Sequence, residues 1–208
     1  MSAAGRVNSG TTSQRVLNAI RRRILARSYL PGARLDPAVL AQDLFSSITP
    51  VRDALNVLTG SGLVETGINE GFHIPNIDEP ALKDLCSWNL EVLLLAIRSW
   101  PKREFVATPA FEPDDDGSAI STAVLFDAIA HRSENAEHSR AVASLNERLH
   151  PIRTIEPFVL EEIAVELAAL RSTFKASDRE QLRRELVTYH RRRQRKAAEL
   201  VRAHYRVA

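Results

Sequence analysis

The ten-residue stretch SSITPVRDAL (Ser46–Leu55) combines residue types that contact nucleic acids with the spacing of a helix. Ser47, Thr49 and Arg52 supply two hydroxyl groups and a guanidinium, and a guanidinium can hold a phosphate or a guanine edge. The apolar residues with helical spacing are Val51, Ala54, Leu55 and Leu58. A helix that buries them, capped by Ser46 or Ser47, turns free N–H groups and a positive dipole end outward. This pattern predicts a helix whose first turn faces a polynucleotide, and a solvated structural helix is the alternative.

Two more helices and a hairpin are predicted around this stretch, within residues 13–76. The first helix runs from Ser13 to about Ala26, and its apolar stripe is Val16, Leu17, Ile20, Ile24 and Leu25. Asp36-Pro37 begins the second, because Asp caps a helix and Pro lacks only an N–H that has no partner there. The stretch LVETGINEGFHI then predicts two short strands, and its turn contains Gly67, Asn69 and Gly71. Three helices and a hairpin form the plan of a winged helix-turn-helix domain.

The composition is that of a soluble globular protein with one large or two modest domains, at 208 residues and 44% hydrophobic. A single cysteine, Cys86, excludes an internal disulfide, and the polar start of the chain lacks a signal-peptide pattern. The longest strongly apolar run, Val92–Ile97, is too short to span a bilayer. We therefore expect a cytoplasmic protein with no membrane partner. Because the net charge is only +2, phosphate contacts must come from individually placed arginines and from a dimer.

The chain changes character after the hairpin, since Gly117 is the only glycine beyond Gly71. Helices are predicted over residues 79–100, 118–132, 135–149, 157–174 and 178–204. The expected fold is mainly α, with the winged helix-turn-helix at residues 13–76 followed by an all-α antiparallel helical bundle at 79–208. Residues 1–12, which are rich in Gly, Ser and Thr, are expected to form a flexible arm.

The residues from Ser28 to Asp78 resemble the DNA-binding domain of the GntR family of bacterial transcription regulators. The family pattern appears as Pro31-Gly32, Arg34-Leu35, Leu40-Ala41, Ser47 through Leu55, Gly62-Leu63-Val64 and Gly71-Phe72. The resemblance implies binding to double-stranded DNA. With the helical reasoning above, it gives the candidate DNA-binding residues Arg34, Ser47, Ile48, Thr49, Pro50, Arg52, Asn69, Gly71 and His73.

Two departures from the family pattern remove positive charge. Ile48 stands where the family usually has Arg, and Glu70 stands where it often has a basic residue. Each lost arginine contact weakens binding by about 1–3 kcal/mol, so weaker affinity or an altered sequence preference is expected. Ile48 can instead pack against a thymine methyl group. His73 suits a DNA contact or a plain strand position equally well.

The helical remainder resembles the effector-binding and dimerisation domain of the FadR-type branch, the FCD domain. The resembling stretches are LFDAIAHRSENAEHSRAV and ELAALRSTFKASDREQLRRELVTYH. Many domains of this branch hold a metal through one Asp and three His, and those positions fall here on Thr122, Phe126, Leu167 and His190. One imidazole cannot hold zinc or nickel tightly, so we expect no metal and no cofactor. The candidate effector pocket is formed by these four residues and Trp88. We expect it to be apolar, and either filled by side chains or suited to a more hydrophobic ligand.

These observations predict a homodimeric transcriptional regulator that binds a two-fold operator. A small organic effector would shift the packing of the bundle and so the spacing of the two reading helices. The resemblance implies an organic acid, although no buried arginine is evident in the first bundle helix to hold a carboxylate in the usual way. The alternative is a degenerate regulator or adaptor that acts through protein contacts of the helical domain. An enzyme is not expected, since the sequence shows no catalytic triad and no Gly-rich phosphate loop.

Overall fold

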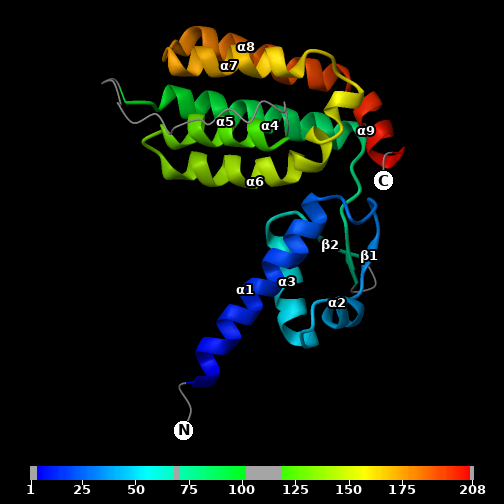
Figure 1. Cartoon of the computed structure of the whole chain (residues 1–208). Helices are drawn as coiled ribbons and strands as arrows, with labels where there is room; N and C mark the ends of the chain where they lie inside the picture. The colour runs from blue at the N-terminus through cyan, green and yellow to red at the C-terminus, as the bar shows by residue number, and fades with distance from the viewer. Residues whose placement is uncertain (1–3, 68–70, 102–118, 207–208) are drawn as a thin grey trace. The chain divides into compact units, whose positions relative to one another are not determined.

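The computed structural model describes residues 4–67, 71–101 and 119–206 of the chain. Its contacts divide the molecule into two compact units, residues 1–76 and 77–207, which are drawn in Figure 1. The N-terminal unit holds three helices and a small sheet, and the second unit is built from helices.

The N-terminal unit contains α1 (Ala4–Leu25), α2 (Pro37–Asp43) and α3 (Ile48–Gly60). Its strands are β1 (Arg34–Leu35), β2 (Glu65–Thr66) and β3 (Phe72–His73), and they pair antiparallel in the order β1-β3-β2. Apolar side chains of all three helices and of the sheet form one core, which includes Val16, Ile20, Leu40, Leu55 and Leu63. The sequence predicted the hairpin of β2 and β3 but missed β1, whose two residues are too few to give a pattern.

The first helix begins at Ala4, whereas the sequence predicted a start at Ser13. No proline lies between the two positions. Once packing of Val16 and Ile20 has nucleated a helix, each further residue adds a hydrogen bond at little cost. The helix therefore extends through a stretch whose glycines suggested a disordered segment.

The helical unit contains α4 (Glu79–Arg98), α5 (Ala119–His131), α6 (Ala136–Arg153), the 3-10 turn η1 (Glu156–Phe158), α7 (Ile163–Lys175), α8 (Arg179–Arg195) and α9 (Ala197–Arg206). Figure 1 shows α7 and α8 along one side and α6 along the other, with α4 and α5 between them. The main core joins α4, α5, α6, α7 and α8 through residues such as Leu93, Phe126, Val142, Leu167 and Leu186. No strand occurs in the parts of this unit that the structure describes.

Three boundaries in the helical unit differ from the sequence prediction. The helix expected over 178–204 is two helices, with Lys196 between them, and the one expected from residue 157 begins at Ile163. The third, α6, continues past Leu149 and through Pro151 to Arg153. It continues because Leu149 and Ile152 are both buried in the core it shares with α4 and α9. Tertiary packing thus overrides the local stop that proline provides.

Candidate nucleic-acid interface and buried polar cluster

One face of α3 is buried in the core, and the opposite face is exposed to solvent. Val51, Ala54, Leu55 and Leu58 are buried, as the helical spacing predicted. Ser47, Ile48, Thr49 and Arg52 are exposed, and Pro50 is half-buried. Ser47 is the N-cap residue, but its side chain makes no capping hydrogen bond. Its hydroxyl is therefore not committed to the helix end, where the first N–H groups of any helix lack intrahelical partners.

Three of the candidate residues lie close together in the sheet. Gly71 and His73 belong to the wing, which is the hairpin of β2 and β3, and Arg34 belongs to the neighbouring strand β1. Arg34 of β1 lies opposite His73 of β3. Nδ1 of His73 lies 3.2 Å from the carbonyl oxygen of Gly71, and a Cβ atom added at Gly71 would lie 3.1 Å from the imidazole ring. A pocket of about 410 Å³ opens here, lined by Arg34, Glu65, His73 and Asn76 among others. Asn69 and Glu70 lie outside the described residues.

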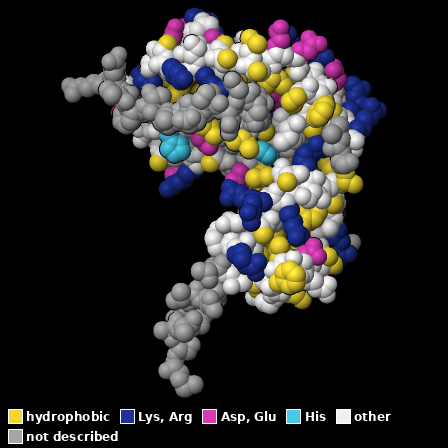
Figure 2. All heavy atoms as spheres, viewed as in Figure 1, with side chains coloured by type: hydrophobic (Ala, Val, Ile, Leu, Met, Phe, Trp, Pro, Cys, Tyr) yellow, Lys and Arg dark blue, Asp and Glu magenta, His cyan; other side chains and the backbone are white. Residues whose placement is uncertain are grey.

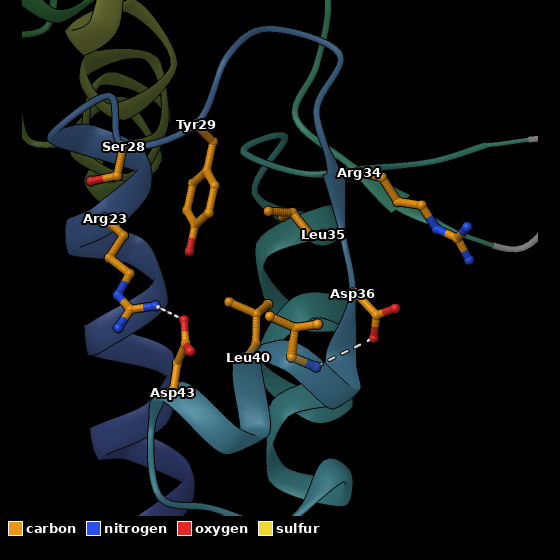
Figure 3. A pocket seen from close by; sticks show the side chains of 9 residues that line it. Arg23, Ser28, Tyr29, Arg34, Leu35, Asp36, Leu40 and Asp43 are labelled. Atoms are coloured by element: carbon orange, nitrogen blue, oxygen red, sulfur yellow. Dashed lines mark hydrogen bonds and ion pairs between the residues drawn. The ribbon is translucent and has the colours of Figure 1, made fainter.

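A second surface pocket of the N-terminal unit, of about 430 Å³, shows how its helices are held together (Figure 3). An ion pair of 3.1 Å between Arg23 and Asp43 joins α1 to α2. Asp36 caps α2 by accepting from the N–H groups of Ala38 and Val39. Arg34 points away from Arg23 and Tyr29 in this view. Figure 2 shows Lys and Arg side chains gathered on the visible face of this unit, which suits a polyanion.

The metal site that the FCD resemblance implies does not fit the residues present. His190 is buried, its Nδ1–H donates to the carbonyl of Leu186 at 2.8 Å, and its Nε2 lies 3.1 Å from the amide nitrogen of Asn89. Burial lowers the pKa of His190 to about 3, so the ring is neutral. The other three positions are Thr122, Phe126 and Leu167. Within the described ranges no group of three or more His, Cys, Asp or Glu side chains could hold a metal ion.

The five residues proposed for the effector pocket do not form one site. Thr122, Phe126, Leu167 and His190 are buried, and the ring of Phe126 stacks on that of His190 at 5.7 Å. Trp88, in contrast, is 53% exposed on α4, which corrects its assignment to this pocket. The helical spacing of α4 buries Cys86, Asn89 and Val92 instead and leaves the indole at the surface.

Two buried arginines next to His190 differ in how their charge is compensated. Arg193 donates to both carboxylate oxygens of Glu156, at 3.1 and 2.7 Å, and to Glu166 at 2.7 Å. Arg153 donates through Nη1 to Oδ1 of Asn146 at 2.7 Å, and its guanidinium lies 5.1 Å from the centre of the Phe126 ring. No carboxylate of the described residues lies within ion-pair distance of Arg153. Its buried charge is therefore only partly compensated.

A small cavity of about 10 Å³ lies among these side chains, and it is lined by Cys86, Asn89, Leu149, Ile152, Arg153, Glu156, Tyr189, His190 and Arg193. Three polar atoms of its lining have no hydrogen-bond partner in the described structure: Oδ1 of Asn89, Nη2 of Arg153 and the hydroxyl of Tyr189. The volume suits about one water molecule. Sequence reasoning missed this site, because Arg153 fell in a predicted loop and Arg193 in a basic run that looked solvated.

Comparison with known proteins agrees with this architecture. The family model described as "Bacterial regulatory proteins, gntR family" matches residues 12–74. The Nta operon transcriptional regulator of Aminobacter aminovorans is 31% identical over 142 residues, which cover 62% of this chain and 67% of that protein. The HTH-type transcriptional regulator McbR of Escherichia coli K12 is 28% identical over 97 residues, which cover 47% of this chain and 44% of McbR.

Two solved structures share the fold at low sequence identity. A GntR transcriptional regulator from Rhodococcus sp. RHA1 has a TM-score of 0.73 at 16% identity, covering 90% of this chain and 97% of that chain. E. coli McbR/YncC has a TM-score of 0.62 at 20% identity, with the same coverage of 90% and 97%. No helix within the described ranges is long and apolar enough to cross a membrane. Because the family model matches residues 12–74 and the Aminobacter regulator is 31% identical over two thirds of its length, the chain belongs to the gntR family of bacterial regulatory proteins.

Proposed function

We propose that the protein is a homodimeric transcriptional regulator that grips a two-fold DNA operator with the first turn of α3 and with the wing. The observation that carries this proposal is the open face of α3, where Ser47, Thr49 and Arg52 are exposed opposite a fully buried stripe. Arg52 holds a phosphate or a base edge, and Arg34 of β1 extends the positive surface next to the wing. Family membership supports DNA as the partner.

Arg52→Ala tests this role in the full-length chain. We expect about 5- to 150-fold weaker binding to a duplex selected by the protein itself, which corresponds to the loss of about 1–3 kcal/mol. Arg140→Ala is the matched control, since Arg140 is an exposed arginine of the helical unit. Affinity should fall steeply with salt for the parent chain, because phosphate contacts release counterions. Unchanged binding by Arg52→Ala would remove α3 from the interface, and a weak, salt-insensitive response would favour the adaptor.

Self-association is proposed through the exposed apolar side chains of two neighbouring helices, α4 and α5. Trp88 and Leu95 of α4 and Ile120 and Val124 of α5 are all exposed. Apolar surface of this kind is typical of a dimer interface. We expect Leu95→Glu with Val124→Glu to give monomers in light scattering, whereas Val165→Glu on the exposed face of α7 should leave the mass unchanged. A mass that stays dimeric in the double variant would contradict this assignment.

The buried polar cluster is proposed as the place where a small organic effector binds. Arg153 and Tyr189 offer donors and Asn89 offers an acceptor, all without partners among the described residues. A ligand with an anionic or carbonyl oxygen satisfies the donors and compensates the charge of Arg153. Because the cavity holds about one water molecule, a ligand must displace side chains, which is how binding would alter the packing of α4, α6 and α8.

A thermal-shift screen of mono- and dicarboxylates with the intact protein tests the effector site. We expect at least one compound to raise the melting temperature of the parent chain and to lose this effect in Arg153→Met. Arg148→Met, an exposed position on the same helix, is the control. Stabilisation that survives Arg153→Met would place the ligand elsewhere.

A further inference from the structure

The turn between α2 and α3 contains a phenylalanine in a backbone conformation that favours glycine. Phe45 has φ +49°, in the left-handed region. Its N–H donates to the carbonyl of Gln42 at 3.2 Å, and the N–H of Ser46 donates to that of Ala41 at 2.9 Å. This pair of hydrogen bonds is the Schellman pattern of a helix C-terminus, in which the position of Phe45 is usually glycine. Phenylalanine here costs conformational strain that glycine avoids.

Burial does not offset this strain, because the side chain of Phe45 is 93% exposed. The turn is fixed from outside: the guanidinium of Arg15 on α1 donates two hydrogen bonds, of 3.2 and 3.1 Å, to the carbonyl of Leu44. The chain thus holds an apolar ring in water at a strained position. The surrounding structure holds Phe45 in a strained conformation, and its exposed side chain contributes nothing to the core. Backbone strain of this kind often marks a functional residue.

Phe45 adjoins the DNA-facing turn of α3 and continues its surface. Ile48, three residues later, is the first residue of α3 and is 46% exposed, and Val39 of α2 is also exposed. Figure 2 shows hydrophobic side chains at the surface of the N-terminal unit, at the end where Figure 1 places α2 and the start of α3. The acidic neighbour Asp43 is paired with Arg23, so its charge is compensated. An apolar patch therefore lies beside Ser47, Thr49 and Arg52.

We propose that Phe45 and Ile48 together read thymine methyl groups in the major groove. The C5-methyl of thymine is the apolar group that the edges of the base pairs present there, and an isoleucine offers no hydrogen bond to guanine. Phe45 widens the apolar contact and excludes water from it. We therefore expect this regulator to prefer A·T pairs at the contacted positions. The inference rests on the proposed DNA contact of α3 and names the bases that this contact selects.

Deoxyuridine in place of thymine removes only the methyl group, so it isolates this contact. A duplex is first selected from a random library by the intact protein, and its thymines are then replaced one at a time. We expect binding to weaken about fourfold for each contacted methyl group, as for the burial of one carbon. Phe45→Gly and Ile48→Ala should each bind the thymine duplex more weakly and discriminate less between thymine and uracil. Phe158→Ala, which alters an exposed phenylalanine of the helical unit, should behave as the parent.

Stability separates a lost contact from a damaged fold. Because glycine adopts φ +49° without strain, the urea midpoint of Phe45→Gly should be retained or raised while its affinity falls. Equal binding of thymine and uracil duplexes by the parent chain, with salt-dependent selective binding intact, would overturn the inference and leave the proposed function standing. Absence of salt-dependent binding to any duplex would instead overturn the proposed function. A fall in urea midpoint that matches the fall in affinity would show that Phe45 serves the fold.

Discussion

His190 shows how burial of a single ionisable residue ties the stability of the helical unit to pH. Its pKa is about 3 in the folded chain and about 6.5 when unfolded, because burial and then the charges of Arg193 and Arg153 oppose protonation. Between these values the unfolded chain binds the extra proton. This residue therefore lowers stability as pH falls through that interval, by up to about 1.4 kcal/mol per pH unit.

His190→Gln removes this titration, so its unfolding free energy should depend less on pH between about 6.5 and 4 than that of the parent chain. Urea unfolding followed by circular dichroism at several pH values measures the two slopes. His131→Gln, at an exposed position of α5, should keep the slope of the parent. Identical slopes for His190→Gln and the parent chain would mean that the ring is accessible to protons in the folded state.

Arg193 compensates two carboxylates, and its removal leaves Glu156 buried without its partner. Arg193→Met should lower the unfolding free energy by about 3–5 kcal/mol. Replacing both residues, as Arg193→Met with Glu156→Leu, should recover a large part of that loss, since no buried charge remains unpaired there. Arg184→Met, which breaks an exposed pair with Glu180, should change stability by less than about 1 kcal/mol. A double variant as unstable as the single one would argue against uncompensated charge as the cause.

At the level of elements, α2 and α3 differ in how their N-termini are capped. We therefore expect the α2 cap to stabilise the fold and the residue at the α3 cap to bind DNA. Asp36 caps α2 through two N–H groups, whereas the side chain of Ser47 makes no bond to α3. Asp36→Ala should therefore cost about 0.5–2 kcal/mol of stability, and Asp36→Asn should restore most of it. Ser47→Ala should cost little stability and weaken DNA binding. Chemical denaturation paired with a binding assay tests both, and a large stability loss in Ser47→Ala would show that its hydroxyl serves the fold.

The sequence predicted the elements whose signals are local. Asp36-Pro37 marks the start of α2, and the spacing of Val51, Leu55 and Leu58 gives the buried face of α3. The start of α1 and the break at Lys196 depend on packing, so propensity and composition placed them wrongly.

The buried polar cluster was beyond sequence reasoning for a related reason. Asn89 and His190 lie 101 positions apart, and Arg193 and Glu156 lie 37 apart. Only the fold brings such residues together, and no local pattern shows that an arginine within a basic run is buried. The residues on the exposed face of α3 all come from one helix, whereas the residues of this cluster come from α4, α6, η1 and α8.

At the scale of the whole molecule, the apolar cores of the two units share no residue among those that the structure describes. The N-terminal core includes Leu55, and the main core of the helical unit includes Leu93. Each unit therefore has what an independent cooperative folding unit requires. Leu55→Ala should destabilise the N-terminal unit by about 2–5 kcal/mol, through lost burial and a cavity. Hydrogen exchange should then quicken in α1 and α3 while protection in α4 and α8 remains that of the parent chain.

Leu93→Ala is the reciprocal variant, because both leucines are fully buried in their own cores. It should quicken exchange in α4, α5 and α8 and leave α3 unchanged. Hydrogen exchange under native conditions, followed by mass spectrometry of peptides from both units, measures the protection of both units in one experiment. A loss of protection that spreads equally through both units, in either variant, would show that the chain unfolds as one cooperative body despite its separate cores. In that case a ligand bound in the helical unit would stabilise the DNA-binding unit by the same free energy, through mass action on a shared unfolding equilibrium.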